Sequence, residues 1–577
     1  MRPAGSRAAT PELPRWRSRL VLFGLGAAFA VLAGRALWLQ TLNDDFLQRK
    51  GESRYSRVLD LGASRGMIVD RNNVPVAIST PVESVAASPA DVKAQPADLR
   101  RLALMLDISP EELREKLADT RREHVYLKRQ LPPEQAERVV QLGIPGVFLQ
   151  REHRRYYPTG EVMAHIIGFT NIDNKGQEAI ELAFEERLAG RSGSRRVIRD
   201  RFGRAVEDVE SIRAPLNGEK LVLSIDTRIQ YLAFRELRDA VAAHRARAGG
   251  IVVLDARSGE VLAMANLPTY NPNNRGKLDA QRTRNRVITD LFEPGSTLKP
   301  FTAAAALEAG LFQSGTVIQT APGRLTIGSH TINDVHPQGA LTVAQVIQKS
   351  SNVGTAKMGL AIPSQTLWDM FHRTGFGTPP SSGFPGEVSG RLRAHSTWRP
   401  IEQATMSYGY GISVSLMQLA RAYTVFSSDG MLYPVTLLRR DSAPEGTRAV
   451  SVQTAQAVRR MLEMAAQPGG TAPGAQVAGY TVAGKTGTAR KLEGKGYATS
   501  RYVASFVGFA PATRPRIIIA VMIDEPSAGQ HYGGAVAAPV FSQVAAGALR
   551  LLAVPPDAPG RTTVLAPADL ALVREDV

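Results

Sequence analysis

The sequence predicts an α+β fold in a chain that is anchored in a membrane, and two observations lead to this prediction: an apolar run near the N-terminus and the order of the strand-like and helical segments. An almost uninterrupted apolar run fills residues 20–39. Strand-like segments follow residue 220, helical stretches fill much of 290–465, and strand-like runs return near the end of the chain. This order fits an antiparallel sheet that the returning chain completes, flanked by helices and joined to an inserted all-helical subdomain.

The amino terminus has the pattern of a basic tail followed by a membrane-spanning helix. Residues 1–19 carry five arginines and one acid, and residues 20–34 carry no charge. Read on to Leu39, the run has the roughly 20 residues that cross a bilayer. Arg35 lies near its end, where the side chain can reach the interface beside Trp38.

The charges around this run predict its orientation. Arginines precede it, and Asp44 and Asp45 follow it, so we expect a cytoplasmic basic tail at 1–19 and an anchor at 20–40. The remainder of the chain would lie outside the cytoplasm. The alternative is a cleaved signal peptide, with a cleavage-like Ala-Phe-Ala at 28–30. That site lies deep inside the apolar run, which favours the anchor.

Composition argues against several kinds of chemistry. The formal charge is +17, but the basic residues are spread along the chain without clusters of interleaved aromatics, so we expect no nucleic-acid partner. The absence of cysteine excludes thiolate catalysis, disulfides and Cys-based zinc sites. The nine histidines show no metal-binding spacing, so we expect neither a protein metal site nor a cofactor.

Residues 55–215 are mixed in character and predict an interaction or spacer domain of α/β type. A strand–turn–strand unit surrounds the turn cluster at 70–73, and residues 92–145 look helical and charged. Residues 177–188 fit one amphipathic helix that ends before two glycines. Residues 62–66 match GxSxG, the nucleophile elbow of α/β-hydrolases, but a strand follows where that motif needs a helix. We interpret this match as chance.

Residues 220–552 predict the largest domain. A strand leads into a helix capped by Asp226, and residues 249–268 form a hairpin around Ser258-Gly259. Apolar strands with turn signals between them return at residues 481–490, 502–511 and 516–526. The tail 553–577 is rich in proline and alanine, so we expect a loose extension there.

The stretch EPGSTLKPF, residues 293–301, is the first candidate for chemistry. Proline is tolerated only in the first turn of a helix, so Pro300 predicts a helix that begins near Ser296. Residues three apart share a face, which would bring Lys299 to the Ser296 hydroxyl. A serine beside such a base is an activated nucleophile. By itself this pattern fits a surface helix start better than a catalytic site.

Two further motifs change that balance. Ser350-Ser351-Asn352 is a polar trio inside an apolar segment, and its alternative reading is a helix cap. Lys485-Thr486-Gly487-Thr488 lies on a strand-like run, and its alternative reading is a hairpin turn. Gly487 would leave space where a substrate presses against the strand.

SxxK, SxN and KTG in this order are the active-site motifs of penicillin-binding proteins and serine β-lactamases. The chain closely resembles the class B penicillin-binding proteins, and among them the division-specific septal type. RGMIVDR, RRYYPTG and GQEAIELAFEERLAG resemble the pedestal motifs of that family, with Gln177-Glu178 as a slight departure. RNRVITDLFEPGSTLKPF, SYGYGISVS and VAGKTGTAR resemble its transpeptidase domain. The resemblance implies a transpeptidase and serine β-lactamase-like domain at 220–552 above a pedestal at 55–215.

The resemblance also implies residue roles. Ser296 would attack the penultimate D-Ala of a peptidoglycan stem peptide, with Lys299 as the base. Ser350 and Asn352 would relay protons and position the donor, and Lys485 would keep the site electropositive. Thr486, Gly487 and Thr488 would bind the substrate, the threonines at its carboxylate, and the N–H groups of Ser296 and Thr488 would form the oxyanion hole. β-Lactam antibiotics would acylate Ser296.

Several related functions share these motifs. A serine β-lactamase usually lacks an anchor and a pedestal, and a bifunctional penicillin-binding protein needs a glycosyltransferase domain. A D,D-carboxypeptidase would pass the acyl group to water, and the sequence does not separate water from an amine. A β-lactam-binding sensor would normally need a larger cytoplasmic part than 1–19. The family implies a partner glycosyltransferase of the SEDS type and other division proteins, which would contact 20–39 and 55–215.

Overall fold

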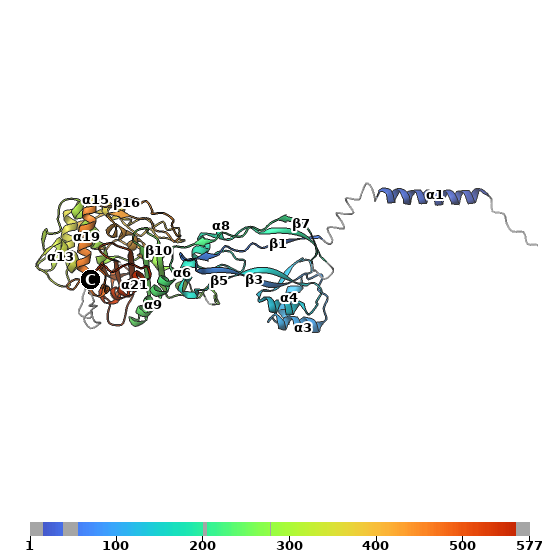
Figure 1. The fold of residues 1–577 in the computed structure, drawn as a ribbon, viewed down its shortest axis with the longest axis horizontal. Coiled ribbons are helices and arrows are strands. Elements are labelled where there is room, and N and C mark those ends of the chain that lie inside the picture. The colour runs from blue at the N-terminus through green and yellow to red at the C-terminus, as the bar shows by residue number, and fades with distance from the viewer. Residues whose placement is uncertain (1–14, 39–55, 200–204, 277, 495, 561–577) are drawn as a thin grey trace, which may run out of the picture. The chain divides into compact units, whose positions relative to one another are not determined.

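The computed structural model describes residues 15–38, 56–199, 205–276, 278–494 and 496–560. Its contacts divide the chain into two compact units (Figure 1). The first comprises residues 1–63, 82–152 and 191–216, and the second comprises residues 64–81, 153–190 and 217–577. The chain therefore enters the second unit three times, and that unit contains every predicted site residue.

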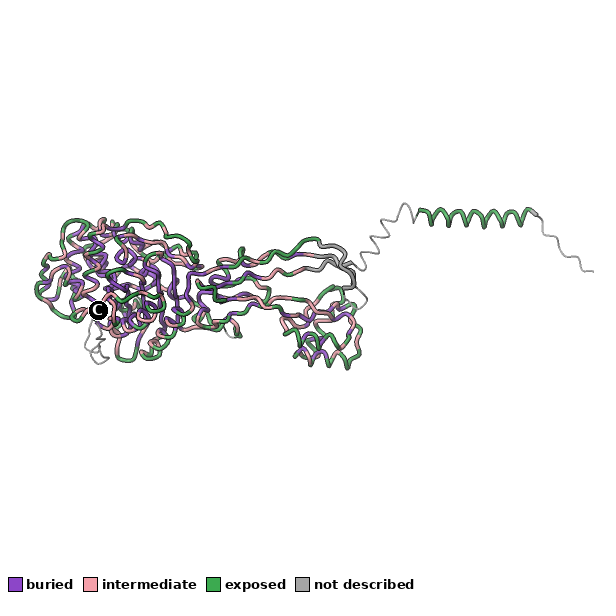
Figure 2. Tube along the Cα trace, viewed as in Figure 1, coloured by how far each residue is buried: buried purple, intermediate pink, exposed green. Residues whose placement is uncertain are grey.

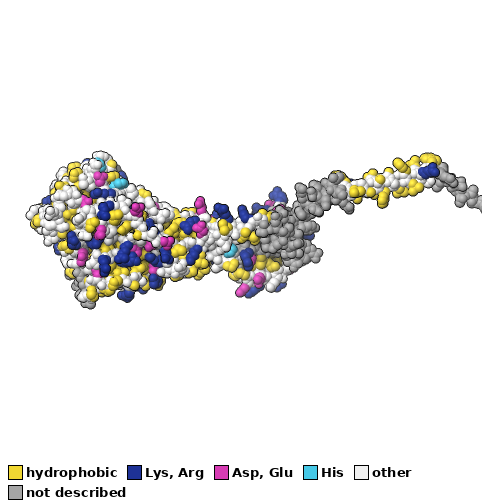
Figure 3. Space-filling model, turned by 45° about the horizontal axis from the view of Figure 1, so that its top comes forward, with side chains coloured by type: hydrophobic (Ala, Val, Ile, Leu, Met, Phe, Trp, Pro, Cys, Tyr) yellow, Lys and Arg dark blue, Asp and Glu magenta, His cyan; other side chains and the backbone are white. Residues whose placement is uncertain are grey.

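The apolar run near the N-terminus forms one helix, α1 (Arg15–Leu37). Residues 16–37 have a mean hydropathy of 2.0, and no part of this stretch is buried (Figure 2). Figure 3 shows it covered by apolar side chains, with basic ones near its N-terminal end. The Arg35 guanidinium lies 4.5 Å from the centre of the Trp38 ring, an arrangement suited to a membrane interface.

By length and composition α1 can cross a membrane. A second apolar stretch, 533–551, passes the same test, but 61% of its most apolar part is buried, as expected for a core helix. Parts of the predicted tail and anchor, residues 1–14 and 39–40, lie outside the described residues, as do Asp44 and Asp45.

The first unit contains a three-stranded antiparallel sheet in the order β1–β6–β7. Its strands are β1 (Ser56–Leu61), β6 (Gly193–Arg199) and β7 (Ala205–Arg213). Strand β1 pairs with β6 from Ser56 opposite Ile198 to Leu61 opposite Gly193. The segment before residue 62 therefore belongs to a different sheet from the hairpin that follows it.

The first unit also holds a small helical layer with its own core. Helices α3 (Pro96–Met105), α4 (Pro110–Leu117) and α5 (Pro133–Val140) each begin with proline, whose missing N–H has no partner to lose at that position. The prediction that 92–145 is helical throughout is wrong at β4 (Val125–Leu131). This segment pairs with β3 (Pro75–Ala87), where its β-branched and aromatic residues suit a strand.

The second unit begins with the predicted strand–turn–strand segment, which the structure confirms. β2 (Ile68–Val69) pairs with the start of β3, and Asp70 Oδ1 closes the turn by accepting from the N–H groups of Asn72 and Val74, both at 2.8 Å. β8 (Leu221–Val222) extends this small sheet in parallel. The same unit includes the end of β5 (Val147–Tyr156) and the short helix α6 (Ala164–Ile167).

The prediction of a single helix at 177–188 is wrong. Two short helices stand there, α7 (Ala179–Ala183) and α8 (Glu185–Leu188). Phe184 breaks the regular geometry between them, with φ −114° and ψ 28°. Gly190 follows at φ +69°, a conformation that glycine adopts without strain.

The main sheet of the second unit has five antiparallel strands in the order β10–β9–β19–β18–β17. Its strands are β9 (Ala248–Asp255), β10 (Val261–Leu267), β17 (Ala483–Glu493), β18 (Gly496–Ala510) and β19 (Ile517–Asp524). The structure confirms both the hairpin around Ser258-Gly259 and the sheet that the returning chain completes. Every residue of β9, β10 and β19 is buried, so the sheet is covered on both faces.

Alternate residues of β9 enter two different cores. Ile251 and Val253 face a core shared with α9 (Thr227–Ala243) and α21 (Ala538–Leu551). Val252 and Leu254 face the larger core of the helical region. The predicted cap is confirmed, because the Asp226 side chain accepts from Arg228 N–H at 3.0 Å.

The helical region lies between β10 and β17 in the sequence. Its principal helices are α12 (Lys299–Glu308), α13 (Val343–Lys349), α14 (Asn352–Ala361), α15 (Ser364–Arg373), α16 (Pro400–Ser407), α17 (Leu416–Ala422) and α19 (Val452–Ala466). Short two-stranded pairs also occur, including β12 (Arg324–Ile327) with β13 (His330–Asn333). The end of this small hairpin contacts the polar trio at 350–352, since the Asn352 amide donates to Asn333 O.

The prediction of a loose tail from residue 553 is wrong for its first residues. Tyr480 donates its hydroxyl to Val554 O at 2.6 Å, and Asp557 accepts from Thr481 N–H at 2.8 Å. These contacts, with that of Ala558 N–H to Gly479 O, hold the chain against the segment that precedes β17 as far as residue 558. The remainder of the tail, 561–577, lies outside the described residues.

Candidate active site

Ser296 stands in a single tight turn that leads into α12. The prediction placed the helix start at Ser296, whereas a 3-10 turn (Gly295–Leu298) begins there and the α-helix begins at Lys299. Pro300 lies in the first turn of α12, as predicted. The backbone N–H of Lys299 donates to Ser296 O, so the two residues are joined across this turn, and they lie three apart as the prediction requires.

Aromatic packing fixes the helix that carries the lysine. The Phe301 ring lies 5.0 Å from the Phe376 ring and 4.8 Å from the Phe426 ring, centre to centre. Tyr423 is fully buried and donates its hydroxyl to Thr297 O at 2.8 Å. The turn before α12 is thus held by a hydrogen bond as well as by its core contacts.

Lys299 and Lys485 meet at one hydroxyl. Both side chains are fully buried. Lys299 Nζ donates to Ser350 Oγ at 3.0 Å and also to the Ser350 carbonyl oxygen, and Lys485 Nζ donates to the same Oγ at 2.9 Å. The three predicted motifs therefore converge in space. A direct contact between Lys299 and the Ser296 hydroxyl stays a prediction.

The polar trio is a junction between two helices, so its helix-cap reading is also correct. Ser350 ends α13 in a left-handed conformation at φ 63°, and Ser351 caps α14 by accepting from Gly354 N–H at 2.9 Å. Asn352 is the first residue of α14, and its amide donates to Asn333 O at 3.1 Å. The sharp reversal at Ser350 turns its hydroxyl toward the two lysines.

A buried carboxylate that the sequence did not reveal supports this junction. Asp334 accepts from the Ser351 hydroxyl at 2.7 Å and from Val353 N–H at 2.9 Å. Asp334 directly follows β13, so these two hydrogen bonds tie the N-terminus of α14 to the end of the β12–β13 hairpin. A single aspartate with no motif around it gives no signal in the sequence.

Lys485, Thr486 and Thr488 lie on β17, which is an edge strand of the five-stranded sheet. Side chains alternate along it, and the Thr486 hydroxyl lies 2.9 Å from the hydroxyl of the buried Thr471. The Thr488 hydroxyl accepts from Gly533 N–H at 3.0 Å. Thr471 is a second polar residue at the site that sequence reasoning missed.

Gly487 lies where β17 packs tightly against the turn that carries Ser296. The expectation was open space for a substrate. In the structure a Cβ at Gly487 would lie 2.5 Å from Ser505 Oγ, 2.8 Å from Pro294 O and 2.9 Å from Thr297 Cγ2. Its missing side chain thus lets β17 approach the turn that carries Ser296, and any substrate contact would be with its backbone.

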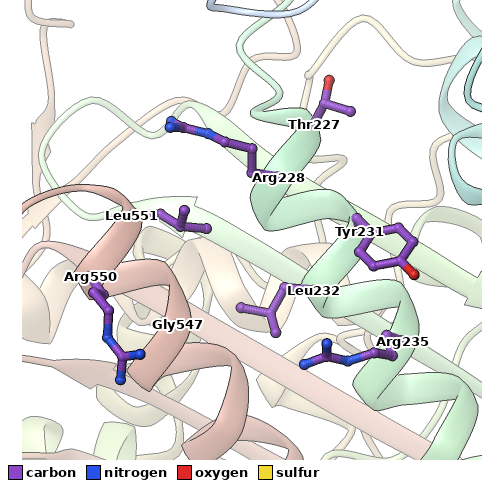
Figure 4. A pocket seen from close by; sticks show the side chains of 8 residues that line it. All are labelled: Thr227, Arg228, Tyr231, Leu232, Arg235, Gly547, Arg550 and Leu551. Atoms are coloured by element: carbon purple, nitrogen blue, oxygen red, sulfur yellow. The ribbon is translucent and has the colours of Figure 1, made fainter.

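One groove lies apart from these residues. A groove of about 620 Å³ lies between α9 and α21, lined by Tyr231, Leu232, Leu551 and three arginines (Figure 4). None of the predicted site residues lines it. The candidate site is identified by its converging polar side chains. Surface charge does not mark it, since Figure 3 shows Lys and Arg distributed over the face in view with acidic residues among them.

The comparisons with known proteins agree with this fold and site. Residues 249–546 match the family described as the penicillin binding protein transpeptidase domain, and residues 60–223 match the penicillin-binding protein dimerisation domain. The chain therefore belongs to the penicillin-binding protein transpeptidases, a family of serine D-Ala-D-Ala transpeptidases. The pairing of these two domains places it among the class B proteins.

Similar proteins cover nearly the whole chain. It is 45% identical over 563 residues to the probable peptidoglycan D,D-transpeptidase PenA of Neisseria gonorrhoeae, covering 97% of each chain. It is 42% identical over 549 residues to the peptidoglycan D,D-transpeptidase FtsI of Escherichia coli K12, covering 94% of this chain and 93% of the other. The transpeptidase domain of Burkholderia pseudomallei penicillin-binding protein 3 is 47% identical, with a TM-score of 0.54, covering 58% of this chain and 97% of that one.

Proposed function

We propose that this protein is a peptidoglycan D,D-transpeptidase that cross-links stem peptides during septal cell-wall synthesis through an acyl-enzyme on Ser296. The observation that supports this most is the Ser350 hydroxyl, which accepts hydrogen bonds from two buried lysines that come from the SxxK and KTG motifs. Similar proteins that cover almost the full length of this chain are named peptidoglycan D,D-transpeptidases, and these names supply the substrate class.

In the acylation step the Ser296 hydroxyl loses its proton to Lys299 as its oxygen bonds to the carbonyl carbon of the penultimate D-Ala. The C–N bond to the terminal D-Ala then breaks, and the leaving amine takes up a proton. A hydroxyl can accept two hydrogen bonds and donate one. Ser350 is therefore suited to pass the proton from Lys299 toward the leaving group, and Asn352 holds the donor peptide.

Binding of the donor uses β17, which is an edge strand of the sheet. Lys485 supplies positive charge, and the hydroxyls of Thr486 and Thr488 bind the terminal carboxylate. The N–H groups of Ser296 and Thr488 hold the oxyanion, a contribution commonly worth ~3–4 kcal/mol for one donor. A peptide that adds along this edge pairs with the backbone at Gly487. β-Lactams occupy the same position and acylate Ser296.

The second step distinguishes this proposal from its nearest alternative. A transpeptidase passes the acyl group to the amine of a neighbouring stem, whereas a D,D-carboxypeptidase of the same fold passes it to water. The membrane-compatible α1 and the similarity to named transpeptidases favour the amine. A β-lactam-binding sensor is a third possibility, and turnover of a stem peptide would exclude it.

The location proposed for the protein is the bacterial cytoplasmic membrane at the division septum. Residues 1–19 would form the cytoplasmic tail, 20–40 the single-pass anchor, and 220–552 the periplasmic catalytic domain. The pedestal at 55–215 and the anchor would contact a SEDS-type glycosyltransferase and other division proteins. Similarity to FtsI of Escherichia coli supports this assignment.

An assay with a pentapeptide stem donor and an amine acceptor tests the activity. The full-length protein in detergent is expected to release D-Ala and form the cross-linked product, and Ser296→Ala is expected to do neither. Release of D-Ala with only tetrapeptide formed would instead support the carboxypeptidase. Benzylpenicillin added beforehand should abolish both products.

A further inference from the structure

Glu293, three residues before Ser296, has an unusual environment. Its Oε1 accepts from Gly411 N–H at 2.7 Å and from the Tyr497 hydroxyl at 3.2 Å. Its Oε2 is buried and has no hydrogen-bond partner among the described residues. A buried carboxyl oxygen without a partner is uncommon and unfavourable, so its retention calls for a reason.

Tyr497 belongs to the outer end of the β17–β18 hairpin. It pairs with Leu492 across the two strands, and the two side chains are 45% and 63% exposed. The Tyr497 ring packs edge-on against the Tyr410 ring, with centres 5.4 Å apart. This ring and its hydroxyl therefore join the end of the hairpin to the 408–411 segment and to Glu293.

The 408–411 segment in turn lies directly against the turn that carries the nucleophile. Gly295 N–H donates to Gly409 O at 3.1 Å. A Cβ at Gly409, where φ is +95°, would lie 2.0 Å from Gly295 O, so only glycine allows this approach. Glu293 thus lies where three segments meet: the turn before Ser296, the 408–411 segment and the β17–β18 hairpin.

We infer that Glu293 is a positioning residue, whose carboxyl and the Tyr497 hydroxyl together latch the β17–β18 hairpin to the turn of the nucleophile. The same strand β17 carries Lys485 and Thr488 farther along, so the latch sets how the substrate-binding edge faces Ser296. On its opposite side the hairpin is held by Lys491, which pairs with Asp524 at 2.8 Å and Glu525 at 2.7 Å. The role in catalysis rests on the proposed function, whereas the latch itself does not.

Acylation kinetics test the catalytic part of the inference. The second-order rate of labelling by a fluorescent penicillin is measured on the full-length protein in detergent. Tyr497→Phe removes only the hydroxyl, and it is expected to lower this rate about tenfold with an unchanged thermal midpoint. Tyr480→Phe removes a hydroxyl that donates to Val554 O away from the hairpin, and it should leave the rate unchanged.

The coupling between the two residues gives a sharper readout. If they form one latch, Glu293→Ala combined with Tyr497→Phe will be no slower than Glu293→Ala alone. Glu293→Gln keeps an acceptor oxygen for Gly411 and Tyr497, so it should retain most of the rate that Glu293→Ala loses. A wild-type rate in Tyr497→Phe, or effects that multiply in the double variant, would overturn the inference.

A spin label tests the latch independently of catalysis. The chain has no cysteine, so Leu492→Cys places a single label on the exposed end of the hairpin. Label mobility is expected to rise in Glu293→Ala and Tyr497→Phe and to stay the same in Tyr480→Phe; equal mobility in all of them would refute the latch. If the wild-type protein fails to bind penicillin, the proposed function falls, but the mobility result still decides whether the latch exists.

Discussion

At the scale of single residues, Ser350 combines a strained backbone with a shared hydroxyl. Its φ of 63° is a conformation that glycine adopts more easily than serine. Its Oγ is the acceptor for both Lys299 and Lys485. The backbone conformation at this position therefore favours glycine, whereas the hydrogen bonds to the two lysines require a hydroxyl. This conflict suggests that the hydroxyl is retained for chemistry.

Two substitutions at Ser350 should separate stability from activity. Ser350→Gly is expected to raise the free energy of unfolding, by up to about 1 kcal/mol relative to Ser350→Ala, since glycine relieves the left-handed strain. Both variants should lose penicillin acylation to a similar extent because both lack the hydroxyl. Denaturant unfolding and labelling kinetics on the same preparations check this. Near wild-type labelling by Ser350→Gly would contradict the role of the hydroxyl.

Gly487→Ala should damage the site by overpacking. The new methyl group would overlap Ser505 Oγ and Pro294 O and push β17 away from the turn of Ser296. Such strain typically costs about 1–3 kcal/mol, so we expect lower stability together with a strong loss of acylation. Gly496→Ala is the matched control, since no atom of the described residues lies within 4 Å of its Cβ position. Equal behaviour of the two variants in thermal unfolding would argue against the tight approach.

Motif residues were the part of the site that the sequence could predict. Ser296, Ser350 and Lys485 occur in patterns whose joint presence is specific, and the structure brings their segments together. Asp334, Thr471 and Glu293 are single polar residues without a pattern, and only tertiary contacts reveal them. The packing role of Gly487 could not be predicted, because the direction of its missing side chain depends on how η3, the turn at Gly295–Leu298, packs on β17. Its contact with a substrate stays a prediction.

At the scale of elements, the sheet was predictable and the pedestal was less so. Strands β9, β10 and β19 are continuous apolar runs because they are buried on both faces, and this pattern is visible in a sequence. Strand β4 was mistaken for helix because its partner β3 lies about forty residues away, and pairing outweighed local propensity. Likewise, nothing local marks Phe184 as the break between α7 and α8.

The short helix α6 contains a buried histidine that should make stability depend on pH. Burial lowers the pKa of His165 from 6.5 to about 4. Its Nε2 lies 2.7 Å from Arg282 O, so this nitrogen carries the hydrogen and the neutral ring is the native form. Between pH 6.5 and 4 the unfolded chain binds more protons than the folded one, so stability falls as the pH falls through this window.

The expected loss is about 3 kcal/mol between pH 6.5 and 4, because each unit of pKa difference corresponds to about 1.4 kcal/mol. His165→Gln can keep the donor to Arg282 O and should remove this part of the pH dependence, whatever its stability at neutral pH. The exposed His336→Gln serves as the control and should leave the pH profile unchanged. Denaturation midpoints measured at half-unit steps of pH provide the test, and a wild-type slope in His165→Gln would contradict it.

At the scale of the whole molecule, a buried ion cluster joins distant parts of the chain within the second unit. Glu181 pairs with Arg65 at 2.6 Å and with Arg155 at 2.7 Å, and all three side chains are at most 1% exposed. Arg65 also donates to the carbonyl oxygens of Glu181 and Asn174. The cluster therefore joins residues 64–81 to residues 153–190, two segments of the second unit that lie far apart in the sequence.

Glu181→Gln should destabilise the protein strongly. It removes the counter-charge that Arg65 and Arg155 share, and of the two only Arg65 keeps a second carboxylate among the described residues, that of Glu185 at 2.7 Å. Breaking a buried ion pair typically costs about 3–5 kcal/mol. Glu186→Gln changes the net charge equally on the exposed side of α8 and should have little effect. The free energy of unfolding in urea measures both. A loss of less than about 1 kcal/mol in Glu181→Gln would show that the cluster is dispensable.

The central claim is that Ser296 is the nucleophile, and labelled penicillin tests it most directly. Membranes from cells that express the full chain are treated with a fluorescent penicillin and separated on a denaturing gel. The wild-type protein should carry the label in the membrane fraction, Ser296→Ala should carry none, and Ser64→Ala, which alters the chance GxSxG match, should be labelled like the wild type. Persistent labelling of Ser296→Ala would contradict the account and move the nucleophile to another residue.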